Sequence, residues 1–236
     1  MSASVAPPLP GRHSYKVEGT NINFAHGTTC LAFRCNGFAI AAADSRSTQG
    51  ETIASQAVTK LIKINDYIIS TMAGSAADCQ YWSRYVGSES QLFELRNKRR
   101  MTVAGASKFY SNILIQYKGR DLSVGSMIVG YDDFGADLFY IDNDGQRVRG
   151  DIFACGSGST FALSVLDQEF RPDLTEDEAV ELARKSIYHA THRDSGTGGQ
   201  INVIVINEKG TNWVVKQDNF ELFHKYINDP SPYPLQ

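Results

Sequence analysis

The sequence has no long apolar run, no excess of positive charge and no CxxC cysteine pair. None of its apolar runs approaches the roughly 18 residues that a membrane-spanning helix needs, and its first residues lack the apolar core of a secretory signal peptide. With 23 lysines and arginines against 26 aspartates and glutamates, the formal net charge is −3. We therefore expect neither a membrane protein, nor a secreted protein, nor a generally basic nucleic-acid binder.

Cysteine is also scarce, and its four positions are Cys30, Cys35, Cys79 and Cys155. Several lie within apolar runs, which predicts buried, reduced thiols in a protein of the cytoplasm or nucleus. No cysteines and histidines are grouped at the spacing of zinc ligands. The sequence therefore predicts no metal site.

What is present suits one domain. The 236 residues are 42% hydrophobic and 21% charged, which allows a sizeable core. Residues 1–27 contain three prolines and little periodicity, so we expect a leader there. The proline-rich segment 229–236 predicts a tail, and 28–228 a single folded domain.

Asn36-Gly37 lies between two apolar runs and predicts a hairpin with a two-residue turn, because both residues accept a positive φ. Its register places Thr28 opposite Ser45, beside Asp44. Strict pleating puts Thr28 and Asp44 on opposite faces, so a contact between them requires a bend or a frayed strand end.

A second hairpin is predicted around Asn65-Asp66, which also separates two apolar runs. Its register places Lys60 opposite Thr71 and close to Gly74. Both hairpins therefore bring polar residues to strand ends.

Helices and further strands follow the hairpins. Ser75 is expected to cap a helix that ends near Asn97, and Thr102 to begin the next one. The remaining elements are strands over 126–132, 137–142 and 151–155, a helix after the glycine loop 156–158, a helix opened by the Thr175–Glu178 capping box, and strands over 201–207 and 213–216. This order suits an α+β fold of two packed sheets with helices outside them.

Several motifs are better explained by structure than by chemistry. The triplets DFG at 133–135 and HRD at 192–194 stand in the reverse of the kinase order. The loop 156–159 lacks the GK[ST] ending of a phosphate loop. The basic run 96–100 suits a helix C-terminus. His189 and His192, three apart on one helix, are expected to pack or face solvent rather than bind a metal.

The segment 26–29, His-Gly-Thr-Thr, means little by itself, because threonine is common in strands. Its meaning changes with Asp44-Ser45-Arg46, with Lys60 and with a glycine ahead of a helix. Together they resemble the proteasome β subunits, a family of N-terminal-nucleophile hydrolases, and most of all their chymotrypsin-like β5 type. The matching segments are GTTCLAF (27–33), AADSRSTQGETIASQ (42–56), STMAGSAAD (70–78), ELRNKRR (94–100), QYKG (116–119), GSGS (156–159) and HRDSGTGG (192–199).

The resemblance implies a four-layer αββα sandwich and an active site centred on Thr28. Self-cleavage of the Gly27–Thr28 bond would make Thr28 the N-terminal residue. A threonine hydroxyl needs a base, and the freed α-amine, with a pKa of about 7.7–8.0, can serve as one. The leader would therefore keep the chain inactive as a protease, and no cofactor is implied.

By the same resemblance, Lys60 is the active-site lysine, whose ammonium favours an ionised Thr28 oxygen. Asp44 is the carboxylate that pairs with this lysine and offsets the cost of burying its charge. Gly74 would donate its backbone N–H to the oxyanion of the tetrahedral intermediate.

Ser157 and Asp194 match the family's residues that orient the N-terminal amine. Thr197 stands where the family usually has serine, so the hydroxyl is kept and a methyl group is added. The implied substrate pocket is lined by Ser47, Thr48, Val58, Ile62, Met72, Ala76 and Gln80.

Met72 is expected to set the specificity of this pocket. Methionine is apolar and adaptable, which favours large apolar or aromatic side chains before the cleaved bond. Ser47 stands where the β5 type typically has alanine, and it predicts a slightly smaller and wetter pocket.

The resemblance also implies partners. It implies a 28-subunit particle, with two β rings between two α rings of seven subunits each, that acts on unfolded polypeptides in the cytoplasm and nucleus. Two alternatives are a non-catalytic, structural β subunit and an amidohydrolase of the same fold that acts on small molecules. Non-catalytic subunits lose the nucleophile, the lysine or the Gly–Thr junction, all of which this chain keeps; native size would separate a particle subunit from a small amidohydrolase.

Overall fold

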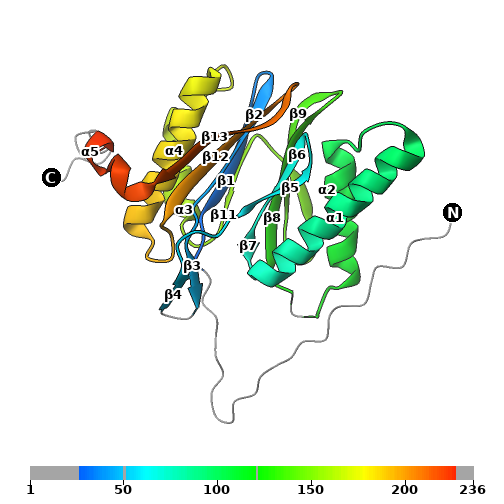
Figure 1. The fold of residues 1–236 in the computed structure, drawn as a ribbon, viewed down its shortest axis with the longest axis horizontal. Coiled ribbons are helices and arrows are strands. Elements are labelled where there is room, and N and C mark those ends of the chain that lie inside the picture. Colours follow the sequence, from blue (N-terminus) through cyan, green and yellow to red (C-terminus); the bar gives the residue numbers. More distant parts are fainter. Residues whose placement is uncertain (1–26, 50–51, 121, 227–236) are drawn as a thin grey trace, which may run out of the picture.

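The computed structural model describes residues 27–49, 52–120 and 122–226. Two β-sheets lie face to face, and two helices cover the outer face of each sheet, which gives the layers αββα (Figure 1). The predicted α+β sandwich is thus confirmed. The expected leader, up to residue 26, and the expected tail over 229–236 lie outside the described residues.

The strands form two large sheets and one short ribbon. The first sheet, in the order β11-β1-β2-β12-β13, contains β11 (Ile152–Cys155), β1 (Cys30–Cys35), β2 (Phe38–Ala43), β12 (Gln200–Asn207) and β13 (Gly210–Asp218). The second, in the order β10-β9-β8-β6-β5, contains β10 (Arg147–Arg149), β9 (Gly135–Ile141), β8 (Val124–Asp132), β6 (Ile68–Thr71) and β5 (Leu61–Asn65). β7 (Ala73–Gly74) pairs with β8, while β3 (Ser47–Gln49) and β4 (Thr52–Ser55) form the ribbon.

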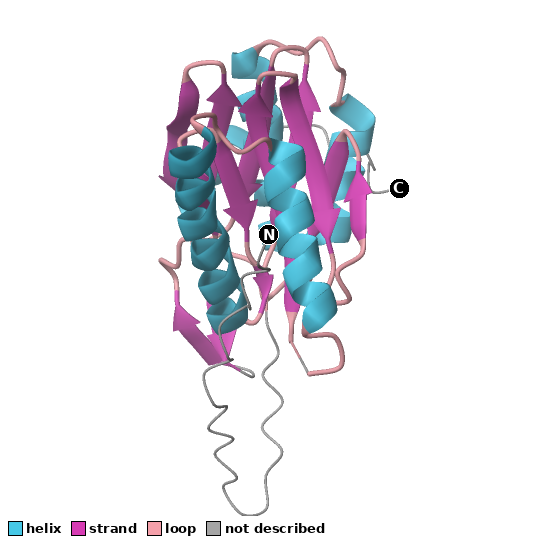
Figure 2. Ribbon diagram, turned by 90° about the vertical axis from the view of Figure 1, so that its right-hand side faces the viewer, coloured by secondary structure: helices cyan, strands magenta, loops and turns pink. Residues whose placement is uncertain are grey.

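The helices form the two outer layers. α3 (Ser159–Glu169) and α4 (Glu176–Arg193) pack on the first sheet, and α1 (Ala76–Asn97) and α2 (Val103–Gln116) pack on the second. Figure 2 shows the second pair lying over its sheet. The chain then forms η1 (Asn219–Leu222) and α5 (Phe223–Tyr226). Within the described ranges, no helix is both long and apolar enough to span a membrane.

The predicted helix caps agree with the structure. The Ser75 hydroxyl accepts a hydrogen bond from Asp78 N at the start of α1, and the Thr102 hydroxyl does the same for Gly105 N at the start of α2. Thr175 and Glu178 form the full capping box of α4. Local sequence thus decides where these helices begin.

Side chains of β2 alternate between two apolar layers, since successive residues of a strand face opposite sides. Phe38 and Ile40 belong to the core beneath α3 and α4. Ala39, Ala41 and Ala43 belong to the core between the sheets. The small alanine side chains allow the sheets to approach closely, which brings the strand ends that carry polar residues together.

The two hairpins differ in how well their registers were predicted. The first pairs Cys35 with Phe38 across Asn36-Gly37, as expected. The second turns one residue later than expected, and its register shifts between Lys63 and Asn65, so that Leu61 rather than Lys60 lies opposite Thr71. This irregularity leaves Lys60 just ahead of β5 rather than inside the ladder.

Candidate active site

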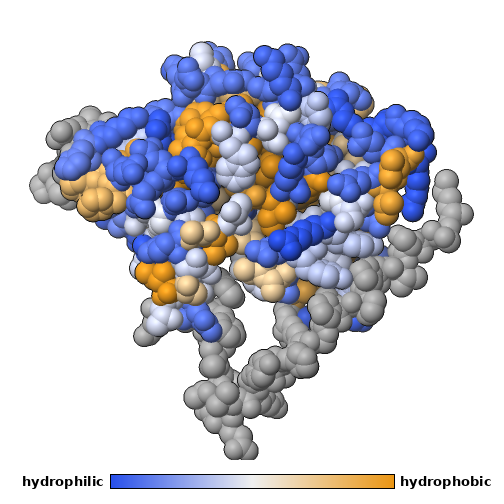
Figure 3. Space-filling model, in the orientation of Figure 1, coloured by the Kyte–Doolittle hydropathy of each residue, from blue (hydrophilic) through white to orange (hydrophobic). Residues whose placement is uncertain are grey.

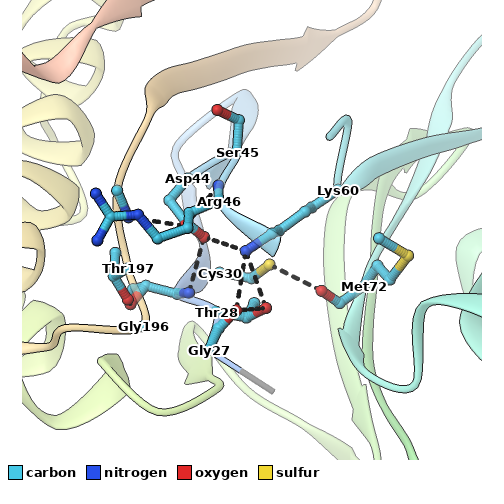
Figure 4. A network of polar contacts seen from close by, with 12 residues as sticks. Gly27, Thr28, Cys30, Asp44, Ser45, Arg46, Lys60, Met72, Gly196 and Thr197 are labelled. Carbon is cyan, nitrogen blue, oxygen red and sulfur yellow. Dashed lines mark hydrogen bonds and ion pairs between the residues drawn. The ribbon is translucent and has the colours of Figure 1, made fainter. Parts of the chain in front are cut away.

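Thr28, Lys60 and Asp44 form a buried line of polar contacts where the two sheets meet (Figure 4). Lys60 Nζ lies 2.9 Å from Thr28 Oγ1 and 2.6 Å from Asp44 Oδ1. Lys60 is 2% exposed and Asp44 is fully buried. Thr28 and Asp44 are therefore linked through the lysine, and the strand bend that a direct contact would require is not needed.

Each oxygen of the Asp44 carboxylate accepts two hydrogen bonds. Besides Lys60, its Oδ1 accepts from Thr29 N at 2.9 Å, and its Oδ2 accepts from Arg46 N at 3.1 Å and Gly198 N at 3.0 Å. Burial raises the pKa of Asp44, and the charge of Lys60 opposes that rise. Three backbone N–H donors and one cation allow an ionised carboxylate to be kept in the interior.

The other side of Thr28 faces a second polar group. Thr28 N donates to Ser157 Oγ at 3.1 Å. Ser157 Oγ and Thr197 Oγ1 both donate to Asp194 Oδ2, at 2.6 and 2.5 Å. The structure thus brings Ser157, Asp194 and Thr197 together beside the nitrogen that the sequence assigned them to orient.

Gly27 lies directly against the candidate nucleophile. Thr28 Oγ1 donates to Gly27 O at 2.6 Å, and Lys60 Nζ lies 3.4 Å from the same oxygen. Gly27 N donates to Thr48 Oγ1 at 2.9 Å. A Cβ at position 27 would lie 2.2 Å from the Gly196 Cα, so this path of the chain requires glycine.

A small pocket opens beside Thr28, at the ends of β1 and β6. Five of the seven predicted pocket residues are in its lining, together with Gly74, Lys60, Thr28, Gly27 and Arg46; the five are Ser47, Thr48, Val58, Met72 and Ala76. Ile62 and Gln80 are not among its described lining residues. Gln80 lines a groove along α1. Ile62 packs against the same apolar cluster as Val58, Met72 and Ala76. A role of these two residues in binding substrate stays a prediction.

Gly74 occupies a position that suits only glycine. Its φ is +107°, and an added Cβ would lie 2.5 Å from Ser123 O. It borders the pocket together with Gly27 and Thr28 and immediately precedes Ser75, the N-cap of α1. Its role as oxyanion donor stays a prediction.

Three residues of the site lie in the matching segments but were assigned no role from the sequence. Thr29 is fully buried; its N–H donates to Asp44 Oδ1, and its hydroxyl lies 2.7 Å from Thr197 Oγ1. Cys30 Sγ donates to Met72 O at 3.4 Å, and a hydrogen bond with Cys155 together with burial raises the pKa of the Cys30 thiol well above its ordinary value. Arg46 donates to Ser195 O at 2.8 Å and borders the pocket. Only contacts between distant segments reveal these positions.

The described part of the chain contains no group of three or more His, Cys, Asp and Glu side chains arranged to hold a metal ion. Its four cysteines are free thiols, and all are buried. The side chains that meet around Thr28 are hydroxyls, an ammonium and two carboxylates, and backbone amides lie beside them.

Comparisons with known proteins agree with the geometry. A family model described as proteasome subunit matches residues 24–206. The chain is 50% identical over 207 residues to proteasome subunit beta type-5 of Dictyostelium discoideum, which covers 88% of this chain and 76% of that protein. It is 49% identical over 205 residues to subunit beta type-5-A of Arabidopsis thaliana, covering 87% and 75%. It is 47% identical over 209 residues to subunit beta type-8 of Homo sapiens, covering 89% and 76%.

The identities extend over most of each chain, and the family model spans the positions of Thr28, Asp44 and Lys60. The protein therefore belongs to the proteasome subunit family.

Proposed function

We propose that this chain is a threonine-type endopeptidase, the catalytic β5-like subunit of a 20S proteasome core. The observation that carries the proposal is the 2.9 Å contact between Lys60 Nζ and Thr28 Oγ1, made in a buried site beside an open pocket. Membership of the proteasome subunit family implies a protease that assembles with other proteasome subunits. A threonine nucleophile and self-cleavage are the finer parts of the proposal.

Self-cleavage would begin with attack of Thr28 Oγ1 on the carbonyl carbon of Gly27. The acyl group then moves from nitrogen to oxygen, which leaves an ester and frees the Thr28 α-amine. Water hydrolyses the ester, so residues 1–27 leave with a C-terminal carboxylate. In this step Lys60, whose Nζ lies 3.4 Å from Gly27 O, would stabilise the negative charge that develops on that oxygen.

Turnover of substrates would use the same atoms. The freed amine takes the proton of Thr28 Oγ1 as this oxygen attacks a peptide carbonyl, and then gives it to the departing amine. The acyl-enzyme ester is hydrolysed by water, and the hydroxyl is regenerated. Ser157 and Asp194 orient the amine, because Ser157 already accepts a hydrogen bond from Thr28 N.

Specificity follows from the walls of the pocket. Val58, Met72 and Ala76 are apolar, and the side chain of Ser47 is small and polar. Lys60, the cation nearest the nucleophile, is already paired with Asp44. We therefore propose cleavage after large apolar residues of unfolded polypeptides.

Exposed apolar side chains support assembly into a larger particle. One apolar patch covers the β3–β4 ribbon, where Ile53 is 51% exposed (Figure 3). Leu95, Phe134 and Phe220 are more exposed still, and burial against other subunits would remove this surface from water. We propose the 28-subunit, four-ring arrangement, and residence in the cytoplasm and nucleus, where buried free thiols remain reduced.

Thr28→Ala tests the proposal in assembled particles. We expect the parent chain, measured by intact mass, to begin at Thr28, and the variant to assemble but lose cleavage after large apolar residues. Retained cleavage by the variant, or a parent chain that keeps its leader in active particles, would overturn the assignment. Fractionation of cells with detection of this chain tests its location.

A further inference from the structure

Thr29 joins two parts of the site that the proposed mechanism treats separately, one through its backbone N–H and the other through its hydroxyl. Its backbone N–H donates to Asp44 Oδ1 at 2.9 Å, the oxygen that also accepts from Lys60 Nζ. Its hydroxyl lies 2.7 Å from Thr197 Oγ1. The side chain is fully buried, so these contacts exclude water.

The hydrogen bonds around Thr29 run in one direction. A hydroxyl has a single proton, and an ionised carboxylate only accepts. Thr197 Oγ1 gives its proton to Asp194 Oδ2 at 2.5 Å, so the proton between the two threonines belongs to Thr29. Ser157 donates to the same Asp194 oxygen and accepts from Thr28 N. Two chains of donors therefore converge on Asp194, one from the Thr28 backbone nitrogen and one from the Thr29 hydroxyl.

Gly158 gives independent evidence that the fold makes room for the contacts among Thr29, Thr197 and Asp194. A Cβ there would lie 2.1 Å from Thr29 Oγ1, 2.9 Å from Thr197 Oγ1 and 3.1 Å from Asp194 Oδ2. Its φ of −91° suits any residue. Glycine is thus required here by the space that the three oxygens occupy and not by the backbone conformation.

We propose that Thr29 is a positioning residue of the threonine protease. Its hydroxyl holds Thr197 and Asp194, which orient the Thr28 amine, while its N–H holds Asp44 against Lys60. One residue thereby fixes the position of the base, which is the Thr28 amine, relative to Lys60, which activates the nucleophile. This inference rests on the proposed function, because it concerns the amine that self-cleavage frees.

Thr29→Val removes the hydroxyl and keeps the shape of the side chain. A lost buried hydrogen bond is equivalent to roughly a three- to tenfold change, so we expect kcat to fall by about tenfold at an unchanged KM. Asp194 would lose the indirect support of one donor and hold the proton of the Thr28 ammonium more strongly. The acidic limb of the pH profile should therefore move up by about half a pH unit.

The experiment compares four kinds of assembled particle: parent, Thr29→Val, Thr29→Ser and Thr191→Val. Thr191→Val is the control, because it removes a threonine hydroxyl that lies within hydrogen-bond distance of Tyr188 O and Asn219 Oδ1, outside the site. The measurements are intact mass, kcat and KM with an apolar fluorogenic peptide, and the pH profile. We expect Thr29→Ser and Thr191→Val to stay within twofold of the parent.

Two results would overturn the inference. One is a Thr29→Val particle with the kcat and pH profile of the parent. The other is a Thr29→Ser particle as impaired as Thr29→Val, since packing of the methyl group would then explain both. If the valine variant fails to assemble, Thr29→Ala removes the same hydroxyl with less bulk and replaces it.

Self-cleavage and positioning can be separated. If Thr29→Val blocks release of the leader, ubiquitin placed directly before residue 28 and removed by a ubiquitin hydrolase exposes Thr28, and the same kinetics decide. Thr28→Ala is measured beside these variants. Cleavage that survives Thr28→Ala refutes the proposed function and this inference together, whereas loss of cleavage there with a normal Thr29→Val refutes the inference alone.

Discussion

Lys60→Met should both destabilise the chain and stop its chemistry. The change removes the counter-ion of a fully buried carboxylate, and breaking a buried pair in this way costs about 3–5 kcal/mol. Three backbone N–H groups still donate to Asp44, so we expect the lower end of that range. For a chain of this length, about 3 kcal/mol corresponds to a fall in Tm of roughly 6–12 °C.

The stability that Lys60→Met loses should depend on pH. Without Lys60, burial holds the folded-state pKa of Asp44 further above its unfolded value. A group with a raised folded pKa contributes stability that is present below its unfolded pKa and is lost as the pH rises through its folded pKa. Lys60→Met should therefore be less destabilised at pH 5 than at pH 8. Adding Asp44→Asn should remove most of both the loss and its pH dependence.

Lys63→Met is the matched control, because Lys63 lies on β5 and pairs with Asp66 at 2.6 Å, but its side chain is 56% exposed. Such surface pairs contribute about 0–1 kcal/mol. Thermal unfolding of the full chain at both pH values gives the stabilities, and intact mass with peptide hydrolysis gives self-cleavage and activity. The reasoning is refuted if Lys60→Met melts within about 2 °C of Lys63→Met at pH 8, or if it still releases its leader.

Three further predictions concern the pocket, the turn beside it and the C-terminal helix. Ser47→Ala should shift the ratio of kcat/KM for peptides with Leu, Phe and Tyr before the cut by roughly two- to fivefold toward the more apolar side chains; unchanged ratios would contradict the wetter pocket. Gly74→Ala should abolish both self-cleavage and peptide hydrolysis, measured by intact mass and fluorogenic peptide, because its Cβ would meet Ser123 O at 2.5 Å. Gly37→Ala, also at positive φ but with no atom within 4 Å of its Cβ, should retain both activities. Burial raises the pKa of Glu181, but hydrogen bonds from Lys225 and Tyr226 of α5, together with Arg184, outweigh it and hold that pKa below its ordinary value. The stabilisation from these contacts is therefore present above about pH 4.3 and is lost as the pH falls through the lowered pKa. Glu181→Gln should lower Tm by about 2–4 °C at pH 7, with a smaller difference below pH 4; an equal difference at both pH values would refute this.

Local patterns predicted the parts of the fold that local chemistry decides. Asn36-Gly37 determines both the turn and the register of the first hairpin, because its turn type allows a single pairing. Asn65-Asp66 is a weaker signal, and the strand could absorb one extra residue between Lys63 and Asn65. The β3–β4 ribbon was not predicted, because its two short strands show no alternation of apolar and polar residues.

Some residues of the candidate site could be found from the sequence, and others only from the structure. Thr28, Asp44 and Lys60 are found through their resemblance to a family, since no periodicity relates positions that lie 16 and 32 residues apart. Five of the seven residues implied for the substrate pocket line the pocket beside Thr28, whereas the part of Ile62 and Gln80 in binding substrate stays a prediction. Thr29 has no motif of its own, although it directly follows the nucleophile.

Thr197 shows why a departure from a family pattern needs the structure to be interpreted. On sequence alone, its added methyl group puts the hydroxyl geometry in question. In the fold, Thr197 is fully buried, and its hydroxyl contacts both Asp194 and Thr29. A β-branched side chain has fewer χ1 rotamers than serine, so the methyl group restricts the hydroxyl to a direction that both partners use. Gly158 leaves the space in which the three oxygens meet. Threonine in place of serine at position 197 therefore limits the motion of the hydroxyl that accepts from Thr29. Thr29, Thr197 and Gly158 are best interpreted together, because each of them determines where this hydroxyl lies.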